Sequence, residues 1–291
     1  MKEDKGVNIG LQQDNFEYRQ SANTLFNFMP KLEYLLDNLR QMKMYPRYVE
    51  ENVEFLNLTY GNRKIRKVAF PMLCFCDINL HKLSLHVEGD VGKKTDGYGK
   101  YGVGLDKKWC ELHGFQPISY LNPISKQTTD FSKIINVGLK SLYDNSEMNE
   151  QYFDYILEQL ALSKPLTGKM LKEKIEIQKN FHDEKEWRFL PNLDDVPIPS
   201  FLNDATMPDY MTWRAKKDMS DALRAEPQTH LNISIEAIKY IFVDTIDDRE
   251  ELLNLLKENF KIEEALILAS KIIIESITLF AFFVELKEKK Q

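Results

Sequence analysis

The stretch Val68-Ala69-Phe70-Pro71-Met72-Leu73-Cys74-Phe75-Cys76-Asp77-Ile78 is almost continuously apolar. A run of this length and character, without the polar alternation of a half-exposed strand, predicts a β-strand buried on both faces. Pro71 has no backbone N–H to donate, which predicts a bulge or a sheet-edge position at that residue. We therefore expect a buried strand over 68–78.

Elements on either side of this strand do not alternate in a regular strand–helix rhythm. Leu32, Leu35, Leu36, Leu39 and Met42 fall on one face of a helix that Pro30 opens and that must end before Pro46. Further strands are predicted at 101–105, 116–121 and 238–243, two helices between about 132 and 163, further helices at 169–180 and 247–260, and an irregular loop at 191–208. This order predicts an α+β fold with a mixed or antiparallel central sheet and flanking helices.

Length and composition set the expected organisation and compartment. The chain has 291 residues, a hydrophobic fraction of 43% and a net charge of -6, which argues against generic nucleic-acid binding. We expect a flexible N-terminal segment at 1–22 and one domain at 23–291, with an extension of uncertain structure from about 262. The apolar stretch 272–284 is too short for a membrane span, and no signal peptide is expected. Three cysteines without an export signal indicate reduced thiols in the cytoplasm.

A charged motif follows at Glu184-Lys185-Glu186-Trp187-Arg188. In a strand, alternation places Glu184, Glu186 and Arg188 on one face. Carboxylates in such a position can stabilise a developing cation, as in an oxocarbenium-like transition state. The motif alone favours a simpler interpretation, a charged strand face that is solvated or paired with a neighbouring strand.

Two aromatic motifs are candidates for ligand contacts. In Tyr45-Pro46-Arg47-Tyr48, Arg47 can fork onto a phosphate or carboxylate between tyrosine walls, or it can cap the preceding helix. In the stretch 98–104, the glycines permit close backbone approach to a ligand and the tyrosines offer stacking surfaces. The alternative for this stretch is a glycine-weakened strand preceded by a mobile loop.

Metal and phosphate-loop chemistry find little support. Cys74 and Cys76 share a strand face, but a zinc site needs about four ligands, so buried inert thiols are the favoured interpretation and no metal is expected. The segment 89–95 lacks the glycine spacing of a phosphate loop.

These motifs together resemble the AbiGi family of abortive phage-resistance proteins. The resemblance rests on 25–28, 45–48, 71–78, 98–105, Trp109, 117–120 and 184–188, and it spans roughly residues 23–243. It implies a bacterial cytoplasmic phage-defence protein, antitoxin-like, whose partner is a neighbouring toxin similar to a nucleotidyltransferase.

The layout also resembles, more distantly, the ADP-ribosyltransferases, and this resemblance implies NAD as cofactor. Asn27 then occupies the first polar position, where histidine or arginine is expected, Tyr98 or Tyr101 the aromatic position, and Glu186 the late glutamate. The candidate catalytic residues on this basis are Glu186, Glu184 and Tyr101. The candidate cofactor-binding residues are Asn27, Arg47, Tyr48, Tyr98 and Arg188.

Two functions of different classes therefore remain open. The first is an NAD-dependent ADP-ribosyltransferase-like enzyme of phage defence, and the second is a non-enzymatic antitoxin that neutralises a cognate toxin. The hypothesis of a metal-assisted nuclease is weak, because clustered acidic ligands are missing from the sequence.

Overall fold

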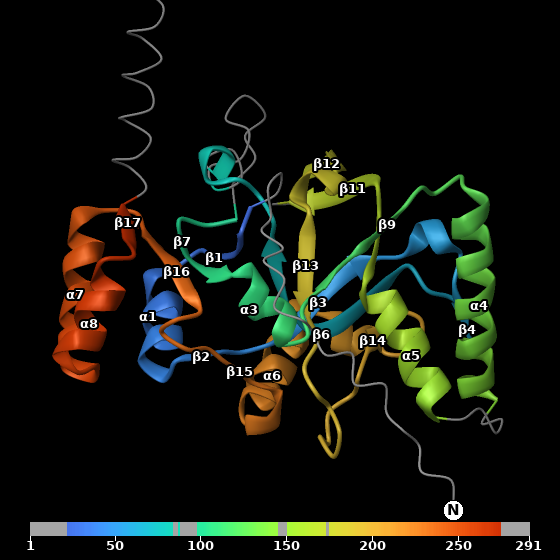
Figure 1. Ribbon diagram of the computed structural model, residues 1–291. Coiled ribbons are helices and arrows are strands. Elements are labelled where there is room, and N and C mark those ends of the chain that lie inside the picture. Colours follow the sequence, from blue (N-terminus) through green and yellow to red (C-terminus); the bar gives the residue numbers. More distant parts are fainter. Residues whose placement is uncertain (1–21, 84–86, 88–97, 145–149, 173–174, 275–291) are drawn as a thin grey trace, which may run out of the picture.

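The computed structural model describes residues 22–83, 87, 98–144, 150–172 and 175–274. Within them, a nine-stranded sheet follows the order β17-β16-β7-β1-β6-β13-β8, and β3 and β14 also pair with β6 (Figure 1). The strands are β1 (Thr24–Met29), β3 (Arg47–Asn52), β6 (Lys67–Cys76), β7 (Tyr101–Asp106), β8 (Gln116–Pro117), β13 (Glu186–Phe189), β14 (Leu202–Asn203), β16 (Ile238–Val243) and β17 (Ile272–Ile274). Only the pairing of β16 with β17 is parallel in this sheet, so the predicted α+β class is confirmed.

The strand predicted at 68–78 is β6, and four other strands pair with it. Its first half pairs with β3 and β14, and its second half pairs with β13 and, at Cys76, with β1. Pro71 lies opposite Tyr48, between the residues that pair with β14 and those that pair with β13. The register between β3 and β6 runs through Pro71 without a shift, so no bulge forms there.

Helices cover the sheet in two groups (Figure 1). Near β16 and β17 lie α1 (Leu32–Gln41), α7 (Ile246–Asn259) and α8 (Ile262–Ala269), whose apolar residues share one core with β7 and β16. At the other end lie α4 (Lys126–Tyr143) and α5 (Glu150–Ala161), which pack on a second core with the first half of β6. The other α-helices in the described part of the chain are α3 (Lys107–Leu112) and α6 (Trp213–Arg224).

Local sequence signals explain where several helices begin. Ser125 accepts a hydrogen bond from the backbone N–H of Thr128 at the start of α4, and Thr245 forms a capping box with Asp248 at the start of α7. The helices predicted at 30–42 and 247–260 are confirmed as α1 and α7. Their leucines fall at helical spacing on the buried face, as the predictions required.

Short two-stranded ladders complete the fold. They are β2 (Lys43–Met44) with β15 (Leu231–Asn232), β4 (Thr59–Tyr60) with β5 (Arg63–Lys64), β9 (Ser119–Leu121) with β10 (Ser163–Pro165), and β11 (Thr167–Lys172) with β12 (Ile175–Asn180). The last pair corrects the helix predicted at 169–180. Ile175 and Ile177 alternate with Glu176 and Gln178, a period of two that favours a strand and outweighs the helix-forming lysines and glutamates.

Other expectations meet the structure only in part. The predicted loop at 191–208 contains β14, which adds to the sheet, and α6 follows it without having been predicted. The C-terminal region contains α8 and β17 as far as Ile274. The segments 1–21, 89–95 and 275–291 lie outside the described residues. In the part of the chain that is described, no helix is long and apolar enough to cross a membrane.

Candidate functional site

Glu186 and Arg188 of the charged motif lie on the buried side of β13, not on a solvated face. Glu186 and Arg188 alternate with the partly exposed Trp187 and Phe189, and Arg188 is 0% exposed. Glu184 precedes the strand in the 3-10 turn η4 (Phe181–Glu184), and Lys185 adopts a left-handed conformation between them. Glu184 is nevertheless buried as well.

Arg188 joins two strands through its guanidinium. Its Nε donates to Glu186 Oε1 at 2.7 Å, one Nη donates to Glu51 of β3, and the other donates to the backbone carbonyl of Ala161. A buried guanidinium is stabilised only when its donors meet carboxylates or carbonyls. The guanidinium of Arg188 meets two carboxylates and one carbonyl.

Lys164 of β10 lies among the three carboxylates. Its Nζ is 2.9 Å from Glu186 Oε2, 3.3 Å from Glu184 Oε2 and 3.9 Å from Glu51 Oε1. The backbone N–H of Glu186 also donates to the Tyr120 hydroxyl at 2.6 Å. Both carboxylate oxygens of Glu186 therefore have a cationic partner, Arg188 on one side and Lys164 on the other.

Tyr98 and Lys179 close the cluster around Glu184. The Tyr98 hydroxyl donates to Glu184 Oε1 and accepts a hydrogen bond from Lys179, whose Nζ also pairs with Glu184. The same ammonium lies 4.4 Å from the centre of the Tyr98 ring, within the range of a cation–π contact. Tyr98 is 39% exposed, so it forms the part of the cluster that faces solvent.

We call this set the buried charge cluster; it consists of Glu51, Lys164, Lys179, Glu184, Glu186 and Arg188. Burial alone would raise the pKa of Glu186, but Arg188 and Lys164 outweigh it and lower the pKa to about 2. Burial would likewise raise the pKa of Glu184, and Lys164 and Lys179 lower it instead. Both carboxylates are ionised at neutral pH, so neither has the raised pKa of a general acid.

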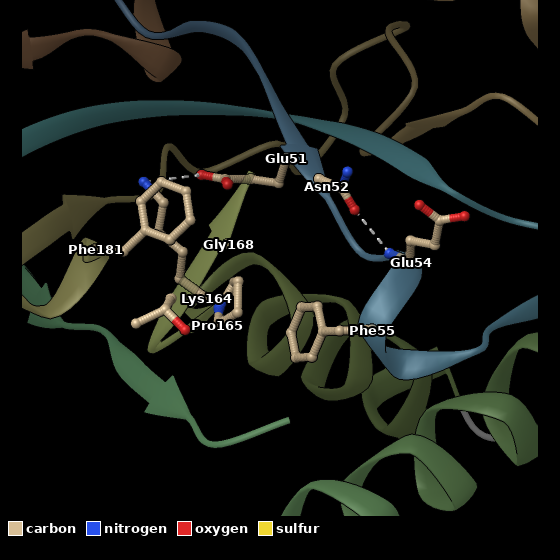
Figure 2. A pocket seen from close by; sticks show the side chains of 9 residues that line it. Glu51, Asn52, Glu54, Phe55, Lys164, Pro165, Gly168 and Phe181 are labelled. Carbon is tan, nitrogen blue, oxygen red and sulfur yellow. Dashed lines mark hydrogen bonds and ion pairs between the residues drawn. The ribbon is translucent and has the colours of Figure 1, made fainter. Parts of the chain in front are cut away.

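A cavity of about 250 Å³ borders the cluster (Figure 2). Glu51 and Lys164 belong to both the cluster and the cavity wall. The rest of the wall is formed by Asn52, Glu54, Phe55, Pro165, Thr167, Gly168 and Phe181. Its volume lies below the range of about 300–1,000 Å³ that is usual for small-molecule pockets.

The structure brings four of the eight candidate site residues into this cluster or against it: Glu184, Glu186, Arg188 and Tyr98. The polar contacts of three others go elsewhere. Asn27 donates to the carbonyl of Cys74 at 2.8 Å, the Tyr101 hydroxyl bonds Asp248 at 3.3 Å, and the buried Tyr48 hydroxyl donates to the carbonyl of Pro199.

Arg47 is exposed on β3, opposite Met72. Its neighbour Tyr45 contacts the Arg224 guanidinium, which lies 4.1 Å from the ring centre. The predicted grouping of Asn27, Arg47, Tyr48 and Tyr101 with Glu186 around one ligand is therefore not what their side chains form.

Sequence reasoning did not identify Glu51, Lys164 or Lys179. Each lies in an ordinary strand without a distinctive motif, and only the fold brings them to Glu186 and Arg188. A weak signal was available: two carboxylates and an arginine on one strand face require cations and carboxylates from neighbouring strands if that face is buried.

The cysteines agree with the inert-thiol interpretation. Cys76 and Cys110 are buried and Cys74 is partly buried, and burial raises the pKa of all three thiols. Among the residues that the structure places, no group of three or more His, Cys, Asp or Glu side chains is arranged to hold a metal ion.

Comparison with known proteins identifies the family. Residues 42–244 match the family described as "abortive phage resistance protein AbiGi, antitoxin". The chain is also 34% identical over 231 residues to the abortive phage resistance protein AbiGi of Lactococcus lactis subsp. cremoris, an alignment that covers 76% of this chain and 90% of that protein. No solved structure matches the chain significantly, so the ADP-ribosyltransferase-like fold stays a prediction. The family match and this relative show that the chain belongs to the AbiGi family of abortive phage-resistance proteins.

Proposed function

We propose that this chain is a non-enzymatic antitoxin of a phage-defence pair, and that it binds and neutralises a cognate nucleotidyltransferase-like toxin in the cytoplasm. The observation that carries the proposal is the state of Glu186, the best candidate for a catalytic carboxylate. Both of its oxygens are engaged, by Arg188 at 2.7 Å and by Lys164 at 2.9 Å. A substrate ribose would have to displace one of these buried cations before it could reach the carboxylate.

Family and charge support the same proposal. The matching family is described as an antitoxin. The net charge of -6 suits a partner whose own site is basic and directed at nucleic acid, because opposite potentials accelerate encounter and exclude wrong partners.

Co-expression with the toxin encoded beside this chain tests the proposal. We expect this chain to relieve toxin-induced growth arrest and to co-purify with the toxin in a fixed ratio. Growth arrest that persists at equal expression of both proteins, with no toxin retained on the tagged chain, would refute it.

NAD-dependent transfer is the second candidate, and one observation favours it. Glu184, Glu186 and Arg188 gather with Tyr98 beside a cavity, as an enzyme site requires. Calorimetric titration with NAD decides between the two. The enzyme hypothesis expects saturable binding that Glu186→Gln abolishes, whereas the antitoxin hypothesis expects no saturable binding at millimolar NAD.

A further inference from the structure

The cavity beside the buried charge cluster has a wall of unusual composition for its size. Phe55 and Phe181 contribute aromatic rings, Pro165 contributes an apolar surface, and Glu51 and Glu54 contribute carboxylates. Figure 2 shows the rings of Phe55 and Phe181 on either side of Pro165, with Glu51 above them. Aromatic faces beside carboxylates are the surroundings that a delocalised cation prefers.

The cations of the buried charge cluster already balance Glu51, so Glu54 is the uncompensated charge of this wall. Lys164 is its only cation among the lining residues, and its shortest ion pairs run to Glu186 and Glu184, at 2.9 and 3.3 Å, while its distance to Glu51 is 3.9 Å. Glu51 Oε1 meets Arg188 and Lys164, so this carboxylate is already paired. The Glu54 carboxylate is exposed at the rim and has no hydrogen bond or ion pair within the described part of the chain.

The volume narrows the class of ligand. About 250 Å³ is too small for a dinucleotide, but it accommodates one long side chain with its terminal group. Arginine matches the wall better than lysine, because its planar guanidinium stacks on aromatic rings and forks onto carboxylates.

We propose that this cavity receives an arginine side chain of the protein that the chain binds. The guanidinium stacks on Phe55 and pairs with Glu54, while Glu51, held by Arg188 and Lys164, forms part of the cavity wall. This inference rests on the proposed antitoxin function for the identity of the partner, but the cavity itself can be tested without the partner.

The first experiment uses Nα-acetyl-arginine methylamide as the probe and the citrulline analogue as its neutral isostere. The amide signals of Asn52 and Gly168, which line the cavity, report binding in NMR titrations of the full chain. We expect saturable shifts at millimolar concentration with the arginine probe and about five-fold weaker binding of the citrulline probe. Equal binding of both probes, or no shifts at about 50 mM, would overturn the assignment.

Two variants make the result specific to the cavity. Glu54→Gln removes a rim charge and Phe55→Leu removes an aromatic face, and both lie outside the buried charge cluster. We expect each to weaken the arginine probe about three-fold or more, with unchanged thermal unfolding for Glu54→Gln. Shifts that persist undiminished in both variants would place the probe elsewhere and refute the proposal.

The complex with the toxin separates this inference from the function on which it rests. If the toxin binds wild type and both variants equally, the arginine site is refuted and the antitoxin function stands. If the variants lose about ten-fold in toxin affinity, both are supported. If the toxin does not bind wild type although the probe does, the antitoxin function fails and the cation site is supported.

Discussion

Glu186→Gln is the substitution that most clearly separates a structural role of the buried charge cluster from a catalytic one. The change is nearly isosteric, yet it removes one of three carboxylates that balance Lys164, Lys179 and Arg188. Glutamine retains one acceptor oxygen and turns an N–H₂ group toward a cation that the carboxylate had bound. A surplus positive charge is then left in a buried site.

The expected loss follows from two independent estimates. Removing one partner of a buried ion pair costs about 3–5 kcal/mol, because the remaining charge is uncompensated. The lowering of the pKa of Glu186 from 4.5 to about 2 corresponds to about 3 kcal/mol of stability at neutral pH. We therefore expect Glu186→Gln to lower the free energy of unfolding by about 3 kcal/mol.

Urea unfolding at pH 7 measures this loss, with Glu54→Gln as the matched control at an exposed carboxylate. The control should stay within about 0.5 kcal/mol of wild type. In the double variant Glu186→Gln/Lys164→Met the charges balance again, so its loss should be smaller than the sum of the single losses by about 1–3 kcal/mol. A loss below about 1 kcal/mol for Glu186→Gln, with the phage-defence phenotype abolished, would refute the structural role and favour catalysis.

The pH dependence of Glu186 and three other groups in the fold give further predictions. The folded-state pKa of Glu186 is lowered, so its contribution to stability is present above pH 4.5 and is lost as the pH falls toward 2; urea midpoints should decline more steeply over this window in wild type than in Glu186→Gln, and parallel curves would contradict this. Lys107 pairs with buried Asp77 at 2.5 Å, so Lys107→Met should lower the free energy of unfolding in urea by about 3 kcal/mol. Lys239→Met, at the more exposed pair with Asp106, should lower it by less than about 1 kcal/mol. Equal losses would contradict the argument from burial. Gly99 has φ +112°, and a Cβ there would lie 2.2 Å from the Met29 carbonyl oxygen. Gly114 has φ +80°, and a Cβ there would meet nothing within 4 Å apart from its chain neighbours. Thermal unfolding should therefore show a loss of stability for Gly99→Ala that exceeds the loss for Gly114→Ala by at least about 1 kcal/mol. Burial raises the pKa of the thiols of Cys76 and Cys110, so iodoacetamide at pH 8 should label them slowly in the native chain and rapidly in urea; rapid native labelling would show that these thiols are accessible.

Periodicity made much of the scaffold predictable. The run at 68–78 is apolar on both faces and became β6, the strand with the most partners in the sheet. The leucines of α1 and α7 fall at helical spacing and were placed correctly. The hairpin of β11 and β12 was missed because its lysines and glutamates favour a helix locally, whereas pairing between the two strands decides the outcome.

Only the part of the site that lies on β13 and directly before it could be predicted from the sequence. Alternation correctly grouped Glu186 with Arg188, and the spacing of Glu184 anticipated its presence although it lies outside the strand. Burial of that face could not be predicted, since it depends on Lys164 and Glu51, which are respectively 22 residues before Glu186 and 137 residues before Arg188. Long-range ion pairs leave no periodic signal in the sequence. Arg47 and Tyr48 were grouped with Glu186 only because their motif contains aromatic and charged residues that could bind a ligand.

The measurement that tests the proposed antitoxin function most directly is the mass of a complex between this chain and its proposed cognate toxin. Both proteins are purified and analysed by size-exclusion chromatography with light scattering, without NAD. On the antitoxin proposal, we expect a complex of fixed stoichiometry in which toxin activity is inhibited. Inhibition that requires NAD and occurs without a stable complex would contradict it and would establish the enzyme in place of the antitoxin.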